Sequence, residues 1–492
     1  MTRTLRAGWP ALVWLATLMI STHGAPAAER PNILWLVAED FGPHLGCYGT
    51  PEVWTPQIDA LAADGVRFTR AYTTTAVCST SRSSFMTGMY STTIGTHNHR
   101  SHRNDGHRLP EGVRVVTDWL RDAGYTTANV RQFPKELGFK GTGKTDWNFH
   151  YEGKPFDTDT WDQLPAHQPF MAQVNFPETH RGGEWNNAHK HVQRLADPAQ
   201  VEIPPYYPDH AITRADWAQY LNTAMAVDAK VGRIVQLLKD DGLWESTIVI
   251  FTADHGAAHV RAKQWPYDSG LHVPLIIRWP ESFPPPKEFT RGGVCDELVM
   301  SIDLSASILD WAGVEIPDKM QGRPFWGDHA PPDREYLFGG RDRGDETVDR
   351  IRTVRDGQYR YIRNFYPERP FSQTNRYKLM QYPVLRLMHR LHDAGELARL
   401  NPHAERLMAP RRAPEELYDL HSDPHELQNL AGQPEYRETL LRLRGVLDEW
   451  IEATDDQGRF PEPADVIEHW ELDMRRGYDA KLEELRRLEE RE

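Results

Sequence analysis

Cysteine is scarce in this sequence: only Cys47, Cys78 and Cys295 occur among 492 residues. Three cysteines exclude the disulfide framework that many small secreted domains need for stability. A Cys47–Cys295 bridge is compatible with the count, but two buried thiols are the simpler expectation. Cys78 instead begins the most informative motif in the chain.

Positive charge is also in short supply. The chain has 57 Lys and Arg against 71 Asp and Glu, which gives a formal net charge of −14. This balance argues against broad nucleic-acid binding, which requires a basic surface. An anionic substrate is still compatible with it, because a local cluster of Arg, Lys and His can outweigh the global charge.

Long apolar runs are missing beyond the N-terminus, so we expect no stable membrane insertion. At the N-terminus, Arg3 and Arg6 precede an apolar stretch from Ala7 to Ile20, and small residues follow at Ala25-Pro-Ala27. This pattern predicts a signal peptide over residues 1–28, with an N-terminal anchor as the alternative. No Cys follows the stretch, which argues against a lipid anchor. We expect an exported protein, periplasmic or secreted.

Internal repeats and low-complexity tracts are absent, and the length is too great for one small core. We expect a catalytic domain over residues 29–330, a C-terminal subdomain over 331–463 and a helical tail over 464–492. Strand and helix patterns alternate in the first of these. Strands are predicted at 32–38, 66–68, 126–130, 169–176, 247–252 and 274–278, and helices at 56–63, 115–122, 213–240 and 302–312.

Alternating strands and helices predict an α/β fold with a doubly wound sheet flanked by helices. The run Asn32–Ala38 is apolar after its first residue, as expected for a strand that is buried on both faces. Thr55 is expected to be the N-cap of the helix that follows. Ligands in such folds bind beyond the carboxyl ends of the strands. Two polar pairs, Glu39-Asp40 and Asp254-His255, occupy such positions.

The pattern changes after residue 330. Residues 351–363 alternate around Asp356-Gly357, which predicts a β-hairpin and thus a smaller α+β subdomain with an antiparallel sheet. Residues 378–407 have a helical, basic pattern. The tail from residue 464 onward is rich in Glu, Arg and Leu and is expected to be a solvated helix.

The motif Cys78-Ser-Thr-Ser-Arg82 carries the chemistry. If it begins a helix, Cys78 and Arg82 share one face, and the free N–H groups and dipole of the helix start favour an anion. A nucleophile placed there suits a tetrahedral oxyanion such as sulfate or phosphate. The Cys-x₃-Arg spacing alone is a weak signal, so its weight comes from the other motifs around it.

This motif resembles the signature of the type I sulfatases, in which the Cys of Cys-x-Pro-x-Arg is oxidised to formylglycine. The likeness extends from Arg30 to Leu430, and Ile203–Asp209 is most similar to the heparan N-sulfatase-like branch. It implies an alkaline phosphatase-like mixed sheet and a formylglycine-generating enzyme as maturation partner. Thr80 stands where the family has Pro or Ala, so this departure bears on the maturation of Cys78.

The resemblance also implies a divalent metal, Ca²⁺ in the family, because hard cations prefer oxygen ligands. The implied metal ligands are Glu39, Asp40, Cys78, Asp254 and His255. His255 departs from the usual Asn, and imidazole suits transition metals better.

The catalytic residues that the resemblance implies are Cys78, Arg82, Lys144, His180 and Lys263. Lys144 and His180 would also contact the substrate, as would Lys263, for which Arg261 is a competing candidate. Asp146 replaces the His that the family often has two residues after this Lys. A cationic stretch, His97, His99, Arg100, His102 and Arg103, is either a solvated loop or a contact for the substrate anion. His97 is the preferred member of it.

We therefore expect a sulfuric ester hydrolase that acts on a sulfate ester, or a sulfamate, of a carbohydrate. In the expected reaction, a hydrated aldehyde at position 78 attacks sulfur in line. The alternatives are a phosphomonoester or phosphonate hydrolase on the same scaffold and a catalytically inactive glycan-binding homologue. Four tryptophans are expected to shape the sugar site: Trp147, Trp161, Trp185 and Trp265.

Overall fold

The computed structural model describes residues 30–102, 105–285, 289–325 and 333–489. The predicted signal peptide and Arg103 lie outside these ranges. Residues Pro31–Glu492 form one compact unit, so the expected division at residue 330 stays a prediction. In the described ranges, no helix has both the length and the apolar character needed to cross a bilayer.

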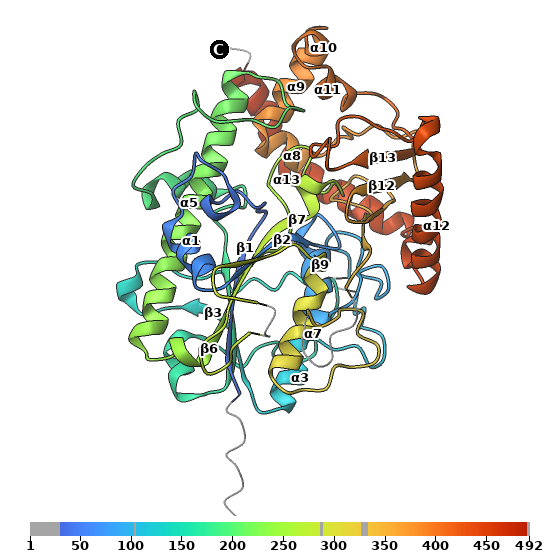
Figure 1. Cartoon of the computed structure of the whole chain (residues 1–492). Coiled ribbons are helices and arrows are strands. Elements are labelled where there is room, and N and C mark those ends of the chain that lie inside the picture. The colour runs from blue at the N-terminus through green and yellow to red at the C-terminus, as the bar shows by residue number, and fades with distance from the viewer. Residues whose placement is uncertain (1–29, 103–104, 286–288, 326–332, 490–492) are drawn as a thin grey trace, which may run out of the picture. The chain divides into compact units, whose positions relative to one another are not determined.

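A mixed β-sheet forms the centre of this unit (Figure 1). Its described strands run in the order β4-β3-β5-β1-β6-β7-β2-β8, and β9 pairs with β2. Strands β5, β1 and β6 are parallel neighbours, whereas β7 is antiparallel to both β6 and β2. The bounds are β1 Asn32–Ala38, β2 Val66–Tyr72, β3 Thr126–Gln132, β4 Thr158–Thr160, β5 Phe170–Phe176, β6 Thr247–Ala253, β7 His272–Arg278, β8 Gly293–Cys295 and β9 Val299–Met300.

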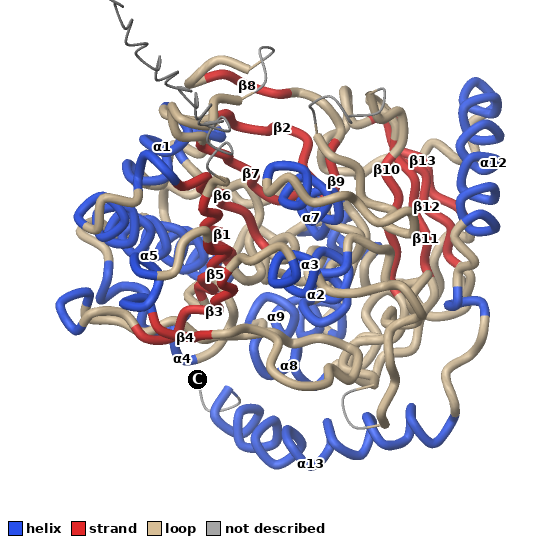
Figure 2. Tube along the Cα trace, turned by 90° about the horizontal axis from the view of Figure 1, so that it is seen from below, coloured by secondary structure: helices blue, strands red, loops and turns tan. Residues whose placement is uncertain are grey.

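Helices cover both faces of the sheet (Figure 2). One face carries α1 (Pro56–Ala63) and α5 (Ala211–Asp240), and the other carries α2 (Cys78–Thr87), α3 (Val116–Asp122) and α7 (Ser301–Trp311). Two shorter helices, α4 (Gly183–Asn187) and α6 (Asp268–Leu271), lie in the connections. The predicted doubly wound sheet with flanking helices is confirmed, and β1, β5 and β6 are buried along their whole length.

The C-terminal part carries a four-stranded antiparallel sheet. Its strands are β10 (Leu337–Arg341), β11 (Ile351–Arg355), β12 (Tyr359–Asn364) and β13 (Glu415–Asp419), and α12 (Arg437–Ala453) packs on β11 and β12. The predicted hairpin is confirmed, with Ile351 opposite Asn364. The three cysteines are free thiols, so the structure contains no Cys47–Cys295 bridge.

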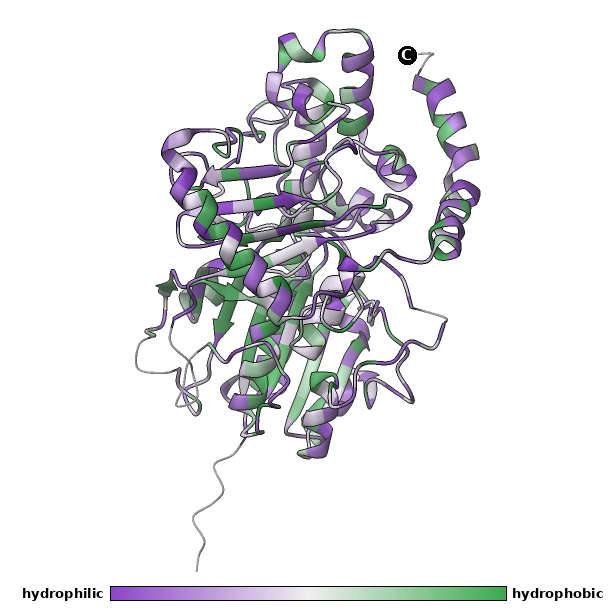
Figure 3. Cartoon of the chain, turned by 90° about the vertical axis from the view of Figure 1, so that its right-hand side faces the viewer, coloured by the Kyte–Doolittle hydropathy of each residue, from purple (hydrophilic) through white to green (hydrophobic). Residues whose placement is uncertain are grey.

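The helical pattern predicted for residues 378–407 and the predicted tail helix are both confirmed. Residues 378–407 form four short helices, because Pro383, Gly395 and Pro402 interrupt the pattern. These helices are α8 (Arg376–Gln381), α9 (Pro383–Asp393), α10 (Leu397–Leu400) and α11 (Pro402–Arg406). The tail helix α13 (Ala464–Glu489) packs against α8 and buries Met474 and Leu482. Its remaining surface is mostly hydrophilic (Figure 3).

The start of α1 is capped by a different residue from the predicted one. Thr55 occupies the N-cap position, but its side chain makes no capping hydrogen bond. Instead, Asp228 of α5 accepts hydrogen bonds from the backbone N–H groups of Gln57 and Ile58, at 3.0 and 2.7 Å. A residue 170 positions away in the sequence therefore satisfies the free donors that every helix start presents.

Asp228 gives the fold a testable pH dependence. Burial raises its pKa to about 7, although the N–H group of Ile58 opposes this shift. An aspartate in the unfolded chain loses its proton near pH 4, so between about pH 4 and 7 the folded state holds the extra proton and becomes less stable as the pH rises. Asp228→Asn keeps an oxygen acceptor but has no charge. We expect the wild type to lose on the order of 2 kcal/mol relative to this variant between about pH 5 and 8.

The measurement is urea unfolding of both proteins across this pH range. The difference between the two curves isolates Asp228, because every other titrating group is common to both. Two curves that stay parallel would show that the carboxylate is already ionised in the folded protein at low pH.

Candidate active site

Two acidic residues meet at one edge of the large sheet. Because β1 and β6 are parallel neighbours with Ala38 opposite Ala253, the residues that follow them emerge side by side. Asp40 and Asp254 are fully buried there, and the N–H of Asp40 donates to Asp254 Oδ1 at 2.8 Å. Asp40 adopts a left-handed backbone conformation with φ +50°, which is uncommon for a residue other than glycine. Such strain is typical of functional sites.

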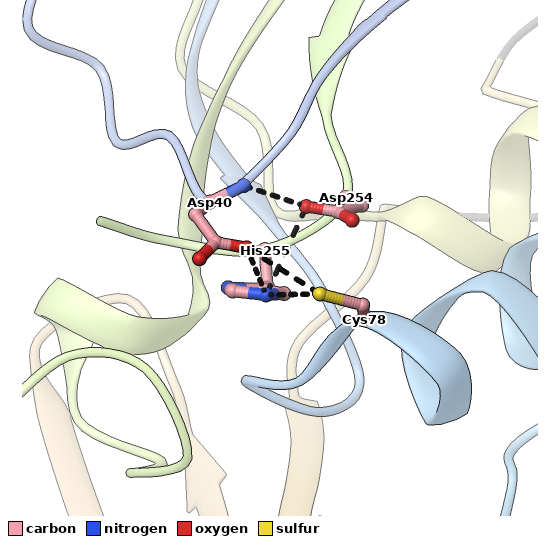
Figure 4. Close-up of side chains that lie close together, drawn as sticks. All are labelled: Asp40, Cys78, Asp254 and His255. Atoms are coloured by element: carbon pink, nitrogen blue, oxygen red, sulfur yellow. Dashed lines mark hydrogen bonds and ion pairs between the residues drawn. The ribbon is translucent and has the colours of Figure 1, made fainter. Parts of the chain in front are cut away.

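Helix α2 brings its first residue to the same edge. Cys78 begins the helix, and its Sγ lies 3.4 Å from Asp40 Oδ1 and 3.3 Å from His255 Nε2. One ligand atom from each of Asp40, Cys78, Asp254 and His255 lies within 4.8 Å of the others. Figure 4 shows these four side chains converging from the ends of two strands and the start of one helix.

This group fits a divalent cation. The side chains of Asp40, Asp254 and His255 are completely buried and offer two carboxylates and one imidazole nitrogen. His255 Nδ1 lies 2.9 Å from the carbonyl oxygen of Gly256, and Nε2 faces the carboxylates. A backbone acceptor at Nδ1 orients the ring so that Nε2 can bind a metal once the metal displaces its proton. Carboxylates suit Ca²⁺, whereas an imidazole ligand favours a transition metal.

Three cationic side chains surround the carboxylates. Lys263 Nζ lies 2.6 Å from Asp40 Oδ2 and 3.6 Å from Cys78 Sγ. Arg82 Nε donates to Asp254 Oδ2 at 3.0 Å. The third, Lys144, is half-buried and donates to Glu39 Oε2 at 2.7 Å. A buried anion bound between these cations would be strongly stabilised, because the low dielectric of the interior strengthens each interaction.

The same cations alter the acidity of Cys78. Burial raises the pKa of its thiol, but the ammonium groups of Lys144 and Lys263 outweigh burial and lower the pKa to about 6. For His255, burial lowers the pKa, whereas Asp40 and Asp254 raise it to about 10. The site therefore stabilises negative charge at position 78 and positive charge between the two carboxylates.

Arg82 keeps one nitrogen for a ligand. Its Nη1 donates to Asn175 Oδ1 at 2.7 Å, whereas the buried Nη2 has no hydrogen-bond partner among the described residues. Asn175, near the end of β5, was not predicted as a site residue, because a single Asn inside an apolar strand gives no signal in the sequence. A buried guanidinium nitrogen without a partner is costly unless a ligand binds it.

The structure places the other predicted site residues at different distances from this cluster. Glu39 lies outside the group of four, because its carboxylate accepts a hydrogen bond from Lys144. His180 is half-buried, and its ring centroid lies 6.3 Å from that of Tyr377 of α8. His97 instead has Asp342 and Asp456 of the C-terminal part as charged neighbours. The ligand and substrate roles of these residues stay predictions.

Arg261 is not part of the cluster. Its guanidinium lies over the rings of Tyr206 and Tyr267 and donates to the backbone carbonyls of His425 and Glu426. Of the two competing candidates, only Lys263 therefore contacts Asp40 and Cys78.

The expected role of the four tryptophans is wrong. Trp147, Trp161, Trp185 and Trp265 are each at most 8% exposed, so none presents a ring face to a sugar. Trp265, for example, stacks on Phe371 with ring centroids 3.7 Å apart. Tryptophans in loops between strands are here part of the cores of the protein.

Helix α8 of the C-terminal part reaches the same site. The ring of Tyr377 lies 5.3 Å from Lys263 Nζ, and its buried hydroxyl has no hydrogen-bond partner among the described residues. Next to it, Lys378 Nζ donates to the backbone carbonyl of Lys263 at 2.6 Å. At the start of α8, Asn375 Nδ2 donates to Gln264 Oε1. Nothing in the sequence indicated this contact, which joins residues more than 100 positions apart.

Comparisons with known proteins agree with this geometry. The sulfatase family model matches residues 31–314, and a model for the C-terminal part of N-sulphoglucosamine sulphohydrolase matches residues 256–384. An ulvan-active sulfatase of Formosa agariphila is 33% identical over 90% of this chain and 78% of its own length. Human N-sulphoglucosamine sulphohydrolase is 27% identical over 88% of this chain and 92% of its own length.

A solved structure shares the fold. A 2-O GAG sulfatase superposes with a TM-score of 0.59 at 20% identity, covering 88% of this chain and 94% of that one. The match to the family model extends over the strand ends and the helix start that form the cluster. This chain is a member of the sulfatase family, whose members are sulfuric ester hydrolases.

Proposed function

We propose that this protein hydrolyses a sulfate ester, or a sulfamate, of a carbohydrate, after oxidation of Cys78 to formylglycine by a formylglycine-generating enzyme. The observation that carries the proposal is the position of Cys78 at a helix start, 3.4 Å from Asp40 and 3.6 Å from Lys263. The relatives named for ulvan and for N-sulphoglucosamine support a sulfated carbohydrate as the substrate.

Different residues of this chain have different roles in the proposed hydrolysis. The aldehyde, once formed and hydrated, supplies an oxygen nucleophile for sulfur and a second hydroxyl that can expel sulfate. Arg82 Nη2 and the ammonium groups of Lys144 and Lys263 bind the sulfuryl oxygens and stabilise the charge that develops on them. His180 or Lys263 donates a proton to the departing oxygen or nitrogen.

A divalent cation, Ca²⁺ in this proposal, would be held by Asp40, Asp254 and His255, with Glu39 as a further candidate. When bound, it adds positive charge that stabilises the transition state. Burial raises the pKa of both carboxyl groups, but the neighbouring cations, chiefly Lys263 at Asp40 and Arg82 at Asp254, outweigh burial and lower it. The site can therefore hold both carboxylates ionised before the metal binds.

Two measurements test the proposed function. Mass spectrometry of the peptide that contains residue 78 should show the –CH₂SH group replaced by –CHO. Release of 4-nitrophenol from 4-nitrophenyl sulfate should exceed release from 4-nitrophenyl phosphate in kcat/KM. Faster phosphate turnover would support the phosphomonoester hydrolase, and an unmodified thiol without any turnover would support an inactive glycan-binding protein. A panel of sulfated glycans that includes ulvan oligosaccharides and N-sulphoglucosamine then identifies the substrate.

Metal removal should have a large effect. Dialysis against EDTA is expected to lower the rate on 4-nitrophenyl sulfate at least about tenfold and to lower the Tm, because the two carboxylates would lose a ligand that stabilises the folded state. Ca²⁺ should restore both. His255→Asn should retain Ca²⁺ binding and bind Zn²⁺ more weakly, as measured by calorimetry, because it removes the imidazole ligand. Full activity with no metal detected by elemental analysis would contradict the proposed cation.

A further inference from the structure

A groove on the outer side of the protein lies between α1, α5 and residues 190–194. We call it the α1–α5 groove. It has a volume of about 690 Å³, and the residues used here to define it are Trp54, Gln57, Lys190, Arg194, Asp228 and Arg233. α1 and α5 lie next to each other on one face of the large sheet (Figures 1 and 2).

The α1–α5 groove is separate from the catalytic cluster. Tyr220 of α5 is level with the strand ends, because its hydroxyl accepts a hydrogen bond from the N–H of Gly42 at 3.0 Å. The groove residues on α5 run from Met225 to Gln236. At about 1.5 Å per residue, they lie roughly 8–24 Å farther along the helix axis. A ligand in this groove would therefore contact the protein away from Cys78.

Trp54 provides an aromatic platform at the rim of the groove. It is 60% exposed, the highest value among the large hydrophobic side chains of the described residues. Its neighbours Val53 and Thr55 are buried, so the backbone on both sides of it is fixed. A large aromatic side chain that the fold holds in solvent has the area to bind a ligand with an apolar face. The C–H face of a pyranose ring is such a face.

Positive charge lines the same groove. Lys190, Arg194 and Arg233 are exposed, and none of them forms an ion pair with a carboxylate in the described ranges. Arg233 donates to the carbonyl of Leu137 and Lys190 to the side chain of Asn187, so both are held in place. Asp228 is the acidic residue of the lining; one of its oxygens caps α1, and burial raises its pKa to about 7. On a protein with net charge −14, this is a local cationic surface.

We propose that the α1–α5 groove is a second binding site for a sulfated polysaccharide chain, with a sugar ring on Trp54 and sulfate groups on Arg194, Arg233 and Lys190. The pairing of an aromatic platform with unpaired cations matches a ligand that alternates apolar ring faces and fixed negative charges. The inference rests on the proposed function only in its choice of a sulfated polysaccharide as the ligand. A second binding site on the protein would keep the enzyme attached to the polymer between turnovers.

Binding is the direct test, and it does not depend on catalysis. Cys78→Ala protein, which cannot acquire the aldehyde, is titrated with ulvan, heparin and desulfated ulvan by calorimetry at two salt concentrations. Adding Trp54→Ala is expected to raise the Kd for the sulfated polymer about tenfold, the loss expected for one buried aromatic contact. Adding Arg194→Ala and Arg233→Ala should weaken binding and reduce its salt dependence, since fewer ions are exchanged.

Matched controls are available elsewhere on the surface. Phe460 is 57% exposed, so Phe460→Ala removes a similar aromatic side chain, and Arg399→Ala on α10 removes a similar exposed charge. Both should leave the Kd unchanged. In the otherwise wild-type enzyme, Trp54→Ala should leave kcat/KM on 4-nitrophenyl sulfate unchanged and lower the rate on dilute polymer several-fold. Because Trp54 is exposed, the Tm should also be unchanged.

Four results would overturn the proposal. These are no binding of ulvan or heparin to the parent protein, equal Kd values for the groove and control variants, equal affinity for desulfated ulvan, and tighter binding of duplex DNA than of either glycan. The last result would assign the groove to nucleic acid instead. A lack of hydrolysis in every assay would contradict the proposed function alone, because the titrations require no turnover.

Discussion

Replacing Cys78 by alanine is expected to lower kcat/KM on an aryl sulfate by at least about 10⁴-fold, because the covalent nucleophile is lost. The fold should survive, since the side chain is small and is only one of several groups that contact Asp40. The assay is release of 4-nitrophenol from 4-nitrophenyl sulfate, with the Tm followed in parallel.

Cys295→Ala is the matched control. Cys295 is a free thiol as buried as Cys78, but it lies on the edge strand β8. Its replacement should leave kcat/KM within about twofold of the wild-type value, as for a substitution outside the site. If Cys78→Ala retained more than a small fraction of the activity, residue 78 would not be the nucleophile, and the reaction would need another group.

Lys263→Met is expected to lower kcat/KM by about 10³-fold, the effect of removing a preorganised cation from a transition state. Methionine retains most of the volume and the stem of the side chain but has no charge. The change also leaves the buried Asp40 without its nearest cation, which lies 2.6 Å away in the wild type. Breaking a buried pair in this way typically costs about 3–5 kcal/mol, so the Tm should fall as well.

Arg352→Met separates the two effects. Arg352 is completely buried and pairs with Asp456 at 2.7 Å and with Asp342 at 3.0 Å, within the C-terminal part. Its loss should lower the Tm comparably, while kcat/KM at a permissive temperature should stay within about threefold of wild type. Equal losses of kcat/KM in both variants would mean that Lys263 acts only by holding the fold together.

The central sheet could be predicted because its physical signals are local. A strand that is buried on both faces is expected to be mostly apolar, and β1 shows this in the unbroken apolar run from Ile33 to Ala38. The capping of α1 could not be predicted, because it depends on Asp228, which comes to the helix start only when α5 packs beside α1. The interruptions of the helical pattern in residues 378–407 can be predicted from the sequence, because Pro383 and Pro402 disfavour a continuous helix.

The site shows the same division. Asp40 and Asp254 each follow a predicted buried strand, and the resemblance to the sulfatases implied that they meet at one metal; the structure places the two strands side by side. Two other features of the site depend on tertiary packing and cannot be predicted from sequence spacing. They are the contact of Glu39 with Lys144 and the hydroxyl of Tyr377, which has no hydrogen-bond partner among the described residues. The prediction that four tryptophans shape the sugar site failed for a similar reason. Residue type alone does not distinguish a ring that packs in a core from one that faces a ligand.

Two hydrogen bonds between distant segments have a consequence for protein engineering. They run from Lys378 to the carbonyl of Lys263 and from Asn375 to Gln264. A chimera that exchanged the C-terminal sheet and helices between two sulfatases would also exchange the residues that anchor Lys263. Residues 260–265 and 375–378 should therefore be transferred together. Sequence drift in one segment would be constrained by the other.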